Sequence, residues 1–302
     1  MSLPAHTPDA LLRRLEWTVV RRLDGLLQGD FRTLFRGNGI DLAGLREYQE
    51  GDDVRHIDWN VTARQQTLHV REYQQDRELT AWFLLDLSPS MDFASDAVSK
   101  RMVLAEFVAV MARLLTGRGN RCGAILFSSG VDRVVPARNG RRQVLHLLDL
   151  LAPRPRVLRT DATDLRAVLH SAAAMLRRRS MVFVVSDFIS QTDWSPALDR
   201  LVRRHDVVAV RLVDPLEASM PDMGLLTLQD AETGEQIVVD TGDRRFRRRF
   251  NDTAEKAATS LRAGFARAGV DCMELSTEDD LLDAFLRFTL MRRRHTYRSA
   301  AP

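Results

Sequence analysis

The sequence has few cysteines and no long run of apolar residues. Only Cys122 and Cys272 occur in 302 residues, and each lies in an apolar segment with the pattern of a strand. We therefore expect reduced thiols in the core and a cytoplasmic protein. No stretch of 18 apolar residues is present, so we expect no membrane-spanning helix. The first 17 residues mix acids and arginines with apolar residues, which is not the pattern of a secretion signal.

Lysine is also scarce. Two of the 44 basic residues are lysines, Lys100 and Lys256, and the other 42 are arginines, against 41 acidic residues. Arginine pairs bidentately with carboxylates, so this near-balance favours ion-pair networks over a nucleic-acid-binding surface. Two arginine runs, at 244–250 and 291–295, lie near acids in segments with a helical pattern. We interpret both as solvated helix faces, with contact to nucleic acid as the less favoured alternative.

Several motifs of enzymes are missing. No GxGxxG follows the first predicted strand and no GxxxxGK[ST] occurs, so dinucleotide and P-loop nucleotide sites lack their fingerprints. HExxH and CxxC are absent, and the seven histidines show no ligand spacing, which argues against zinc. The GxSxG turn of serine hydrolases is absent too.

What the sequence does contain is an alternation of strands and helices. Apolar runs predict strands at 81–86, 122–128, 181–186, 206–213 and 271–275. Helical patterns lie between and after them, at 98–117, 140–152, 163–178, 195–204, 242–268 and 278–294. This alternation predicts an α/β fold, with a mostly parallel sheet and helices on both faces.

Two further segments stand outside that alternation. Thr7-Pro8 begins a helical pattern that runs to Gly29, and residues 37–75 contain short runs typical of small antiparallel strands. Two apolar runs flank Thr233-Gly234, which predicts a hairpin at 224–240. We therefore divide the chain into an N-terminal helix with a small β extension, 1–75, and an α/β domain, 76–302, that carries the hairpin as an insertion.

Polar side chains follow two of the predicted strands. Asp86 ends the strand at 81–86 and is followed by Ser88 and Ser90, Asp187 follows the strand at 181–186, and Thr163 precedes a helix. Ligands in open α/β sheets bind beyond the carboxyl ends of the strands. Two carboxylates and three hydroxyls there suit a small hard cation such as Mg²⁺. Taken singly, Ser88–Asp92 reads as a turn with a cap, Thr163 as a helix cap and Asp187 as a turn acid.

The same residues carry a resemblance to a known family. The pattern DxSxS…T…D, filled by Asp86, Ser88, Ser90, Thr163 and Asp187, resembles the metal-ion-dependent adhesion site (MIDAS) of von Willebrand factor A domains. Residues 37–73, with the run REYQEGDDVRHIDW, are similar to the signature of a bacterial family, domain of unknown function 58 (DUF58). Glu50 stands where that signature usually has proline, and residues 214–241 resemble the family's later hairpin.

The resemblance implies a site and a role. Ser88 and Ser90 would ligate Mg²⁺ or Mn²⁺ directly, Thr163 directly or through water, and the two aspartates through hydrogen bonds and waters. An open coordination position would accept a Glu or Asp from a partner protein. Members of the family lack known catalysis and are often encoded beside AAA+ ATPases of the MoxR type. The implied role is that of an adaptor for such a chaperone-like ATPase, which matures or remodels a client protein complex.

The signature segment permits two interpretations. Its charged residues could form an ion-pair lattice beside Tyr48 and Trp59, or a contact surface for the partner. The residues concerned are Arg46, Glu47, Asp52, Asp53, Arg55, Asp58 and Arg64. His56 and Asp58 are two residues apart, but no nucleophile accompanies them.

Two other functions remain as alternatives. A Mg²⁺-dependent phosphohydrolase could use Asp86 as nucleophile or base, although Ser88 stands where phosphatases of the haloacid dehalogenase type carry a second aspartate. An A-type domain could also bind RNA through the arginine runs. We expect a non-enzymatic interaction module, because no nucleophile–base pair is evident.

Overall fold

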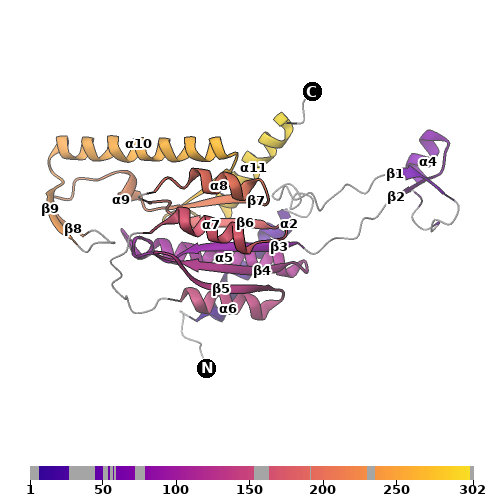
Figure 1. Cartoon of the computed structure of the whole chain (residues 1–302), viewed down its shortest axis with the longest axis horizontal. Coiled ribbons are helices and arrows are strands. Elements are labelled where there is room, and N and C mark those ends of the chain that lie inside the picture. The colour runs from indigo at the N-terminus through magenta and orange to yellow at the C-terminus, as the bar shows by residue number, and fades with distance from the viewer. Residues whose placement is uncertain are drawn as a thin grey trace.

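The computed structural model describes residues 7–26, 45–49, 54, 57, 59–71, 79–152, 163–190, 192–229 and 235–299. Within these ranges the main body is a six-stranded sheet between two layers of helices (Figure 1). Its strands are β3 (Thr80–Asp86), β4 (Arg121–Phe127), β5 (Val131–Arg138), β6 (Met181–Ser186), β7 (Asp206–Val213) and β10 (Asp271–Ser276).

The strands lie in the order β10-β7-β6-β3-β4-β5, and all neighbours are parallel except β4 and β5. The predicted mostly parallel α/β sheet is therefore confirmed. The antiparallel edge strand β5 was not predicted. Pro136 and the charged residues Asp132 and Arg133 lie within it, and only an edge strand tolerates a proline and such exposure.

The two faces of the sheet bury different helices. Phe83 and Leu85 of β3 belong to a core with α5 (Lys100–Gly117), α6 (Arg141–Leu151) and α11 (Leu281–Ser299). Leu84, between them, points to the other face and a core with α7 (Leu165–Met175), α8 (Ser195–Val202) and α10 (Arg244–Ala268). This alternation explains why the central strands read as continuous apolar runs, since both of their faces are covered.

The N-terminal helical segment packs on the first of these layers. It consists of α1 (Pro8–Leu15), a π-helical turn (Glu16–Val20) and α2 (Arg21–Leu26). Thr7 caps it as predicted, because its hydroxyl accepts a hydrogen bond from the Ala10 N–H at 3.3 Å. Leu12 and Leu15 join the core beside α5, and Glu16 forms an ion pair with Arg113 of α5 at 2.6 Å. Of the described helices, none has both the length and the apolar character needed to cross a membrane.

Two small antiparallel pairs complete the structure. β1 (Leu45–Glu47) pairs with β2 (His69–Arg71), near the short helix α4 (Trp59–Gln65), and Figure 1 draws this unit apart from the main sheet. β8 (Leu225–Gln229) pairs with β9 (Gln236–Asp240) as a hairpin at the left of Figure 1. Two single-turn helices, η3 (Pro89–Asp92) and α9 (Pro215–Ala218), follow β3 and β7.

Candidate metal centre

The predicted site residues converge where the order of the strands reverses. β3 connects to β4 and β5 on one side, and the chain then crosses to β6 and continues through β7 to β10 on the other. β3 and β6 are neighbours, so their carboxyl ends form the crevice in which open α/β sheets bind ligands. Asp86 is the last residue of β3 and Asp187 directly follows β6. The topology thus places both acids at the switch point.

Asp86 is buried and both of its oxygens accept hydrogen bonds. The Ser88 N–H donates to Oδ1 at 2.9 Å, and the Ser186 hydroxyl donates to Oδ2 at 2.6 Å. Burial, and after it the negative charge of Asp187, raises the pKa of Asp86 to about 7. Because burial disfavours the ionised form of this carboxylate, a cation bound beside it would stabilise that form.

The two serines after β3 face each other. Their hydroxyl oxygens lie 3.0 Å apart, at the start of the single turn η3. Ser88 occupies the cap position of that turn, yet its side chain makes no capping hydrogen bond. The turn-with-cap interpretation therefore does not account for this hydroxyl.

Thr163 lies just before α7 and does not cap it. Asp164 is the cap instead, since its carboxylate accepts hydrogen bonds from the Ala167 N–H at 3.1 Å and the Thr192 hydroxyl at 2.8 Å. The Thr163 hydroxyl is buried and has no hydrogen-bond partner among the described residues. A buried hydroxyl without a partner costs free energy, and a cation would satisfy its oxygen.

Asp187 is an acid of a turn and also part of a buried ion pair. Its Oδ1 accepts from the Ile189 N–H at 3.0 Å, as the turn interpretation expects. Its Oδ2 accepts from the Lys100 ammonium at 2.8 Å, and both side chains are almost fully buried. Both Asp187 oxygens therefore already have donors within the protein.

Lys100 is the functional candidate that the sequence analysis missed. It begins α5 and is completely buried, with a second hydrogen bond to Glu217 of α9 at 2.6 Å. Burial disfavours the ammonium form, but the charges of Asp187 and Glu217 outweigh that effect and leave the pKa of Lys100 raised. The one available signal was compositional, because a lysine is unusual in a chain that otherwise uses arginine.

Glu217 is held in place by a second acid at the end of a strand. Asp214 follows β7 and caps α9, and the backbone N–H of Asp214 donates in return to Glu217 Oε2 at 3.2 Å. The Asp214 carboxylate also accepts from the N–H and hydroxyl of Ser95, each at 2.9 Å. Asp214 thus links the end of β7 to the loop before α5 through internal hydrogen bonds and has a structural role.

The donor set fits a small hard cation that relies on hydroxyl oxygens. Two buried carboxylates and a facing pair of serine hydroxyls lie at the switch point. Thr163, whose hydroxyl has no partner among the described residues, is tied to the loop after β6, because the Ser190 hydroxyl donates to the Thr163 carbonyl at 3.1 Å. Within the described ranges, no group of three His, Cys, Asp or Glu side chains could hold a metal ion. A transition metal that needs nitrogen or sulfur ligands is therefore a poorer fit than Mg²⁺ or Mn²⁺.

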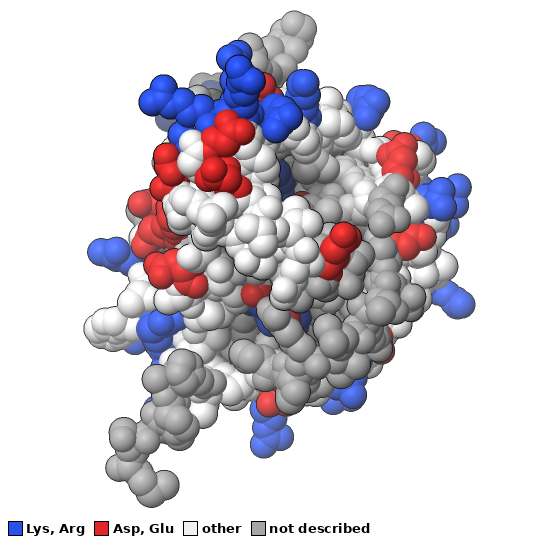
Figure 2. All heavy atoms as spheres, turned by 90° about the vertical axis from the view of Figure 1, so that its left-hand side faces the viewer, with Lys and Arg blue, Asp and Glu red and all other residues white. Residues whose placement is uncertain are grey.

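The surface around this end of the sheet carries charges of both signs. Figure 2 faces the end at which β3 and β6 finish, with basic side chains gathered at the top and acidic ones beside them. The first arginine run begins α10 there, and Arg247 forms an ion pair with Asp222 at 3.0 Å. The second run is corrected in part: Arg292 is 2% exposed and pairs with Asp206 and Asp271, so it does not lie on a solvated face.

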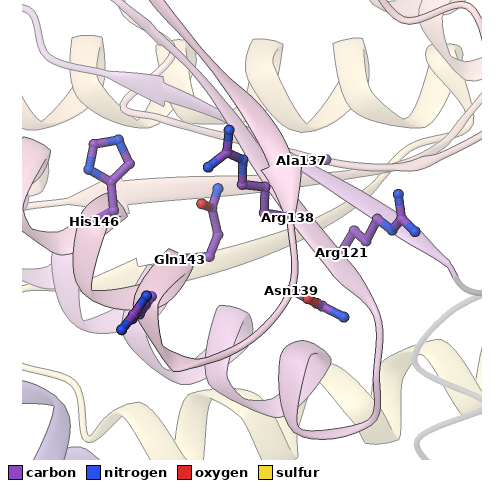
Figure 3. Close-up of a pocket in the computed structure, with 7 residues that line it drawn as sticks. Arg121, Ala137, Arg138, Asn139, Gln143 and His146 are labelled. Carbon is purple, nitrogen blue, oxygen red and sulfur yellow. The ribbon is translucent and has the colours of Figure 1, made fainter.

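A separate hollow lies at the other end of the sheet. It has a volume of about 580 Å³ and is lined by Arg121, Ala137, Arg138, Asn139, Arg142, Gln143 and His146 (Figure 3). Arg121 begins β4, whereas Asp86 ends the parallel strand β3. This basic hollow is therefore not part of the candidate metal centre.

The signature segment is described only in part. Tyr48 donates its N–H to the Leu68 carbonyl at 2.7 Å, and Trp59 is 66% exposed at the start of α4. Glu47 and Arg64 lie on β1 and α4. Asp52, Asp53, Arg55, His56 and Asp58 lie outside the described residues, as does the side chain of Arg46. The choice between an ion-pair lattice and a partner surface stays open.

Comparison with known proteins places the chain among uncharacterised relatives. An uncharacterised protein from Mycobacterium bovis, Mb1516, is 37% identical over 291 residues, which cover 94% of this chain and 90% of the relative. Among solved structures, BatB from Bacteroides thetaiotaomicron has a TM-score of 0.45 at 13% identity, covering 72% of this chain and 99% of that one. A von Willebrand factor type A protein from Catenulispora acidiphila has a TM-score of 0.32 at 13% identity, covering 46% and 34%. The model of the family described as protein of unknown function DUF58 matches residues 44–260, and the chain belongs to that family.

Proposed function

We propose that this protein is a non-enzymatic interaction module that binds an acidic residue of a partner protein through Mg²⁺ or Mn²⁺. The observation that carries the proposal is the unpartnered Thr163 hydroxyl at the same switch point as the facing hydroxyls of Ser88 and Ser90. A hard cation requires oxygen ligands; the Thr163 hydroxyl has no partner among the described residues, and the Ser88 and Ser90 hydroxyls bond to each other. The two buried aspartates supply the negative charge that offsets the charge of the cation.

The neutral hydroxyls and the charged carboxylates of the site would have different roles. Ser88, Ser90 and Thr163 would hold the cation, because their hydroxyls are not committed to backbone capping. Asp86 and Asp187 would act through hydrogen bonds and water, since their oxygens already accept bonds from Ser186, Lys100 and backbone N–H groups. When bound, the cation supplies a Lewis-acidic position for one further carboxylate. Neutral ligands keep that position electron-poor, so an acidic partner residue is favoured.

We propose a MoxR-type AAA+ ATPase as the partner, with a client protein complex as the target of the pair. The choice of this partner rests on the resemblance to the family. The metal centre adds only that the partner should present an acidic residue. We place the protein in the cytoplasm, because the thiols of Cys122 and Cys272 are both unpaired. Fractionation of cells with an antibody to the native protein tests that placement.

The partner experiment is a calorimetric titration of the ATPase into this protein with Mg²⁺ and with EDTA. Binding should need the metal and should weaken for Ser90→Ala, Thr163→Ala and Asp187→Ala. A carboxylate–metal contact shielded from water is worth roughly 2–4 kcal/mol, or about 30- to 1000-fold in affinity. The control Arg247→Ala with Arg248→Ala should change mainly a salt-sensitive association rate. Equal affinity in EDTA and in all variants would place the partner elsewhere, on the 46–64 surface.

The phosphohydrolase alternative has its own test. Both Asp86 oxygens accept hydrogen bonds, and Ser88 occupies the position of a second acid. We therefore expect no turnover above background on phosphoesters, nucleotides, peptides or esters with Mg²⁺ present. Hydrolysis that Asp86→Asn abolishes would support the enzyme instead. A salt titration of RNA binding separates the third interpretation in the same way.

A further inference from the structure

A buried lysine adjoins the candidate metal centre, and its partners are both carboxylates. The Lys100 ammonium donates to Asp187 at 2.8 Å and to Glu217 at 2.6 Å, with none of the lysine side chain exposed. Removing an ammonium from water is costly unless it is paired, so its burial here needs both acids. Glu217 is in turn held by the backbone of Asp214, which fixes the pair on the end of β7.

The position of this ammonium changes what Asp187 can do. Asp187 Oδ2 accepts from Lys100 and Oδ1 accepts from the Ile189 N–H. Each carboxylate oxygen has a second lone pair that can accept a hydrogen bond from a water molecule. Direct ligation of a cation by Oδ2 would compete with its hydrogen bond from the ammonium. A positive charge that contacts one acid of the site also repels any divalent cation bound nearby.

A count of charges shows the consequence for the partner. Asp86, Asp187 and Glu217 together carry three negative charges when ionised, and Lys100 offsets one. A divalent cation bound among them would make the whole cluster neutral. Without Lys100 the loaded cluster would keep one negative charge and would repel an incoming carboxylate.

We propose that Lys100 sets the charge of this site, weakening its intrinsic hold on the divalent cation and keeping the loaded site receptive to an acidic partner residue. This inference rests on the proposed function, because it assigns a determinant of specificity to the same metal centre. Lys100 is a positioning residue here, since it acts through Asp187 and Glu217.

The test measures two affinities that should move in opposite directions. Mn²⁺ alone is titrated calorimetrically into wild type and Lys100→Met, and a glutamate-rich peptide is then titrated into each Mn²⁺-loaded protein. Loss of a unit positive charge that contacts an acid of the site should strengthen Mn²⁺ binding by about tenfold or more. The same change should weaken peptide binding by about tenfold or more. A merely structural role would weaken both, because a distorted site binds nothing better.

Three further variants make the charge argument specific. Lys256→Met removes the other lysine, which is exposed on α10, and should leave both affinities unchanged. Glu217→Gln should weaken Mn²⁺ binding and strengthen peptide binding. The double variant Lys100→Met with Glu217→Gln restores the net charge and removes one of the two acids that lose their ammonium partner, so it should fold and bind Mn²⁺ within about threefold of wild type. Circular dichroism establishes that each variant is folded.

The outcomes separate this inference from the proposed function. Suppose that Ser88→Ala loses Mn²⁺ binding while Lys100→Met and the double variant bind Mn²⁺ and the peptide as wild type does. That result overturns the role of Lys100 and leaves the metal centre intact. Mn²⁺ binding that Ser88→Ala does not change overturns the metal centre itself. Absence of Mn²⁺ binding from wild type and Lys100→Met alike overturns both.

Discussion

Replacing Thr163 by valine should make the protein more stable than wild type in EDTA and less stable than wild type in saturating Mg²⁺. Valine has nearly the shape of threonine but lacks the hydroxyl, so the substitution removes a buried polar atom without opening a cavity. The Thr163 hydroxyl has no partner in the described residues, whereas that of Thr289, another buried threonine, donates to the Phe285 carbonyl at 2.7 Å. Thr289→Val is therefore the matched control.

The expected magnitudes follow from the partners of the two hydroxyls. An unpaired buried hydroxyl costs about 1–3 kcal/mol of stability. In EDTA the free energy of unfolding of Thr163→Val should therefore be about 1–2 kcal/mol larger than that of wild type. Mg²⁺ at a hundred times its dissociation constant stabilises a binding protein by about 2.7 kcal/mol, and the variant should lose most of that gain. Thr289→Val loses a satisfied hydrogen bond and should be about 1 kcal/mol less stable in both conditions.

The assay is equilibrium unfolding in urea, followed by far-ultraviolet circular dichroism with EDTA and with Mg²⁺. The reasoning predicts that Thr163→Val is more stable than wild type in EDTA and less stable in saturating Mg²⁺. If Thr163→Val loses as much stability in EDTA as Thr289→Val does, the hydroxyl has a partner within the protein. That result would refute the argument that this oxygen is kept for a cation.

Four other predictions concern single residues, two for Asp86 and one each for Gly123 of the sheet and for the buried Arg292. Because burial raises the pKa of Asp86 to about 7, the folded protein holds this proton more tightly than the unfolded chain. In EDTA, the contribution of Asp86 to the free energy of unfolding should therefore fall as the pH rises from about 4 to 7. Urea unfolding of Asp86→Asn should no longer show that pH dependence. Protonation of Asp86 competes with the cation, so calorimetric Mg²⁺ affinity should drop below pH 7, and a flat profile between pH 5.5 and 8 would contradict this. Gly123→Ala would place a Cβ 2.8 Å from the Trp82 ring and 2.9 Å from the Val135 carbonyl, so unfolding should show a loss of about 1–3 kcal/mol; an unchanged midpoint would mean that Trp82 moves freely. Arg292→Met places an apolar side chain beside the carboxylates of Asp206 and Asp271, which are each only 11% exposed, and should cost about 3–5 kcal/mol. A smaller loss than for Arg203→Met, which removes an exposed pair with Asp199, would contradict this network.

The parts of the fold that depend on burial were predictable from the sequence. The central strands are apolar on both faces, so their runs mark β3, β4, β6 and β7 within a residue or two. The position of Asp86 and Asp187 at neighbouring strand ends followed from the same runs, because carboxyl ends of parallel strands meet at one edge of a sheet.

Other features depend on contacts between distant residues and had no local signal. Lys100 meets Asp187 and Glu217 across 87 and 117 residues of sequence, and no periodicity connects them. The choice between Thr163 and Asp164 as the cap of α7 is a matter of geometry, since both residue types cap helices well. The edge strand β5 was missed because its exposure removes the apolar pattern by which buried strands are recognised.

Anomalous diffraction from crystals grown with Mn²⁺ tests the central claim most directly. One strong peak should lie within bonding distance of the Ser88 and Ser90 hydroxyl oxygens, beside Thr163, and it should be absent from crystals of Ser88→Ala. Mn²⁺ density elsewhere on the molecule only, or an unchanged peak in Ser88→Ala, would contradict the account.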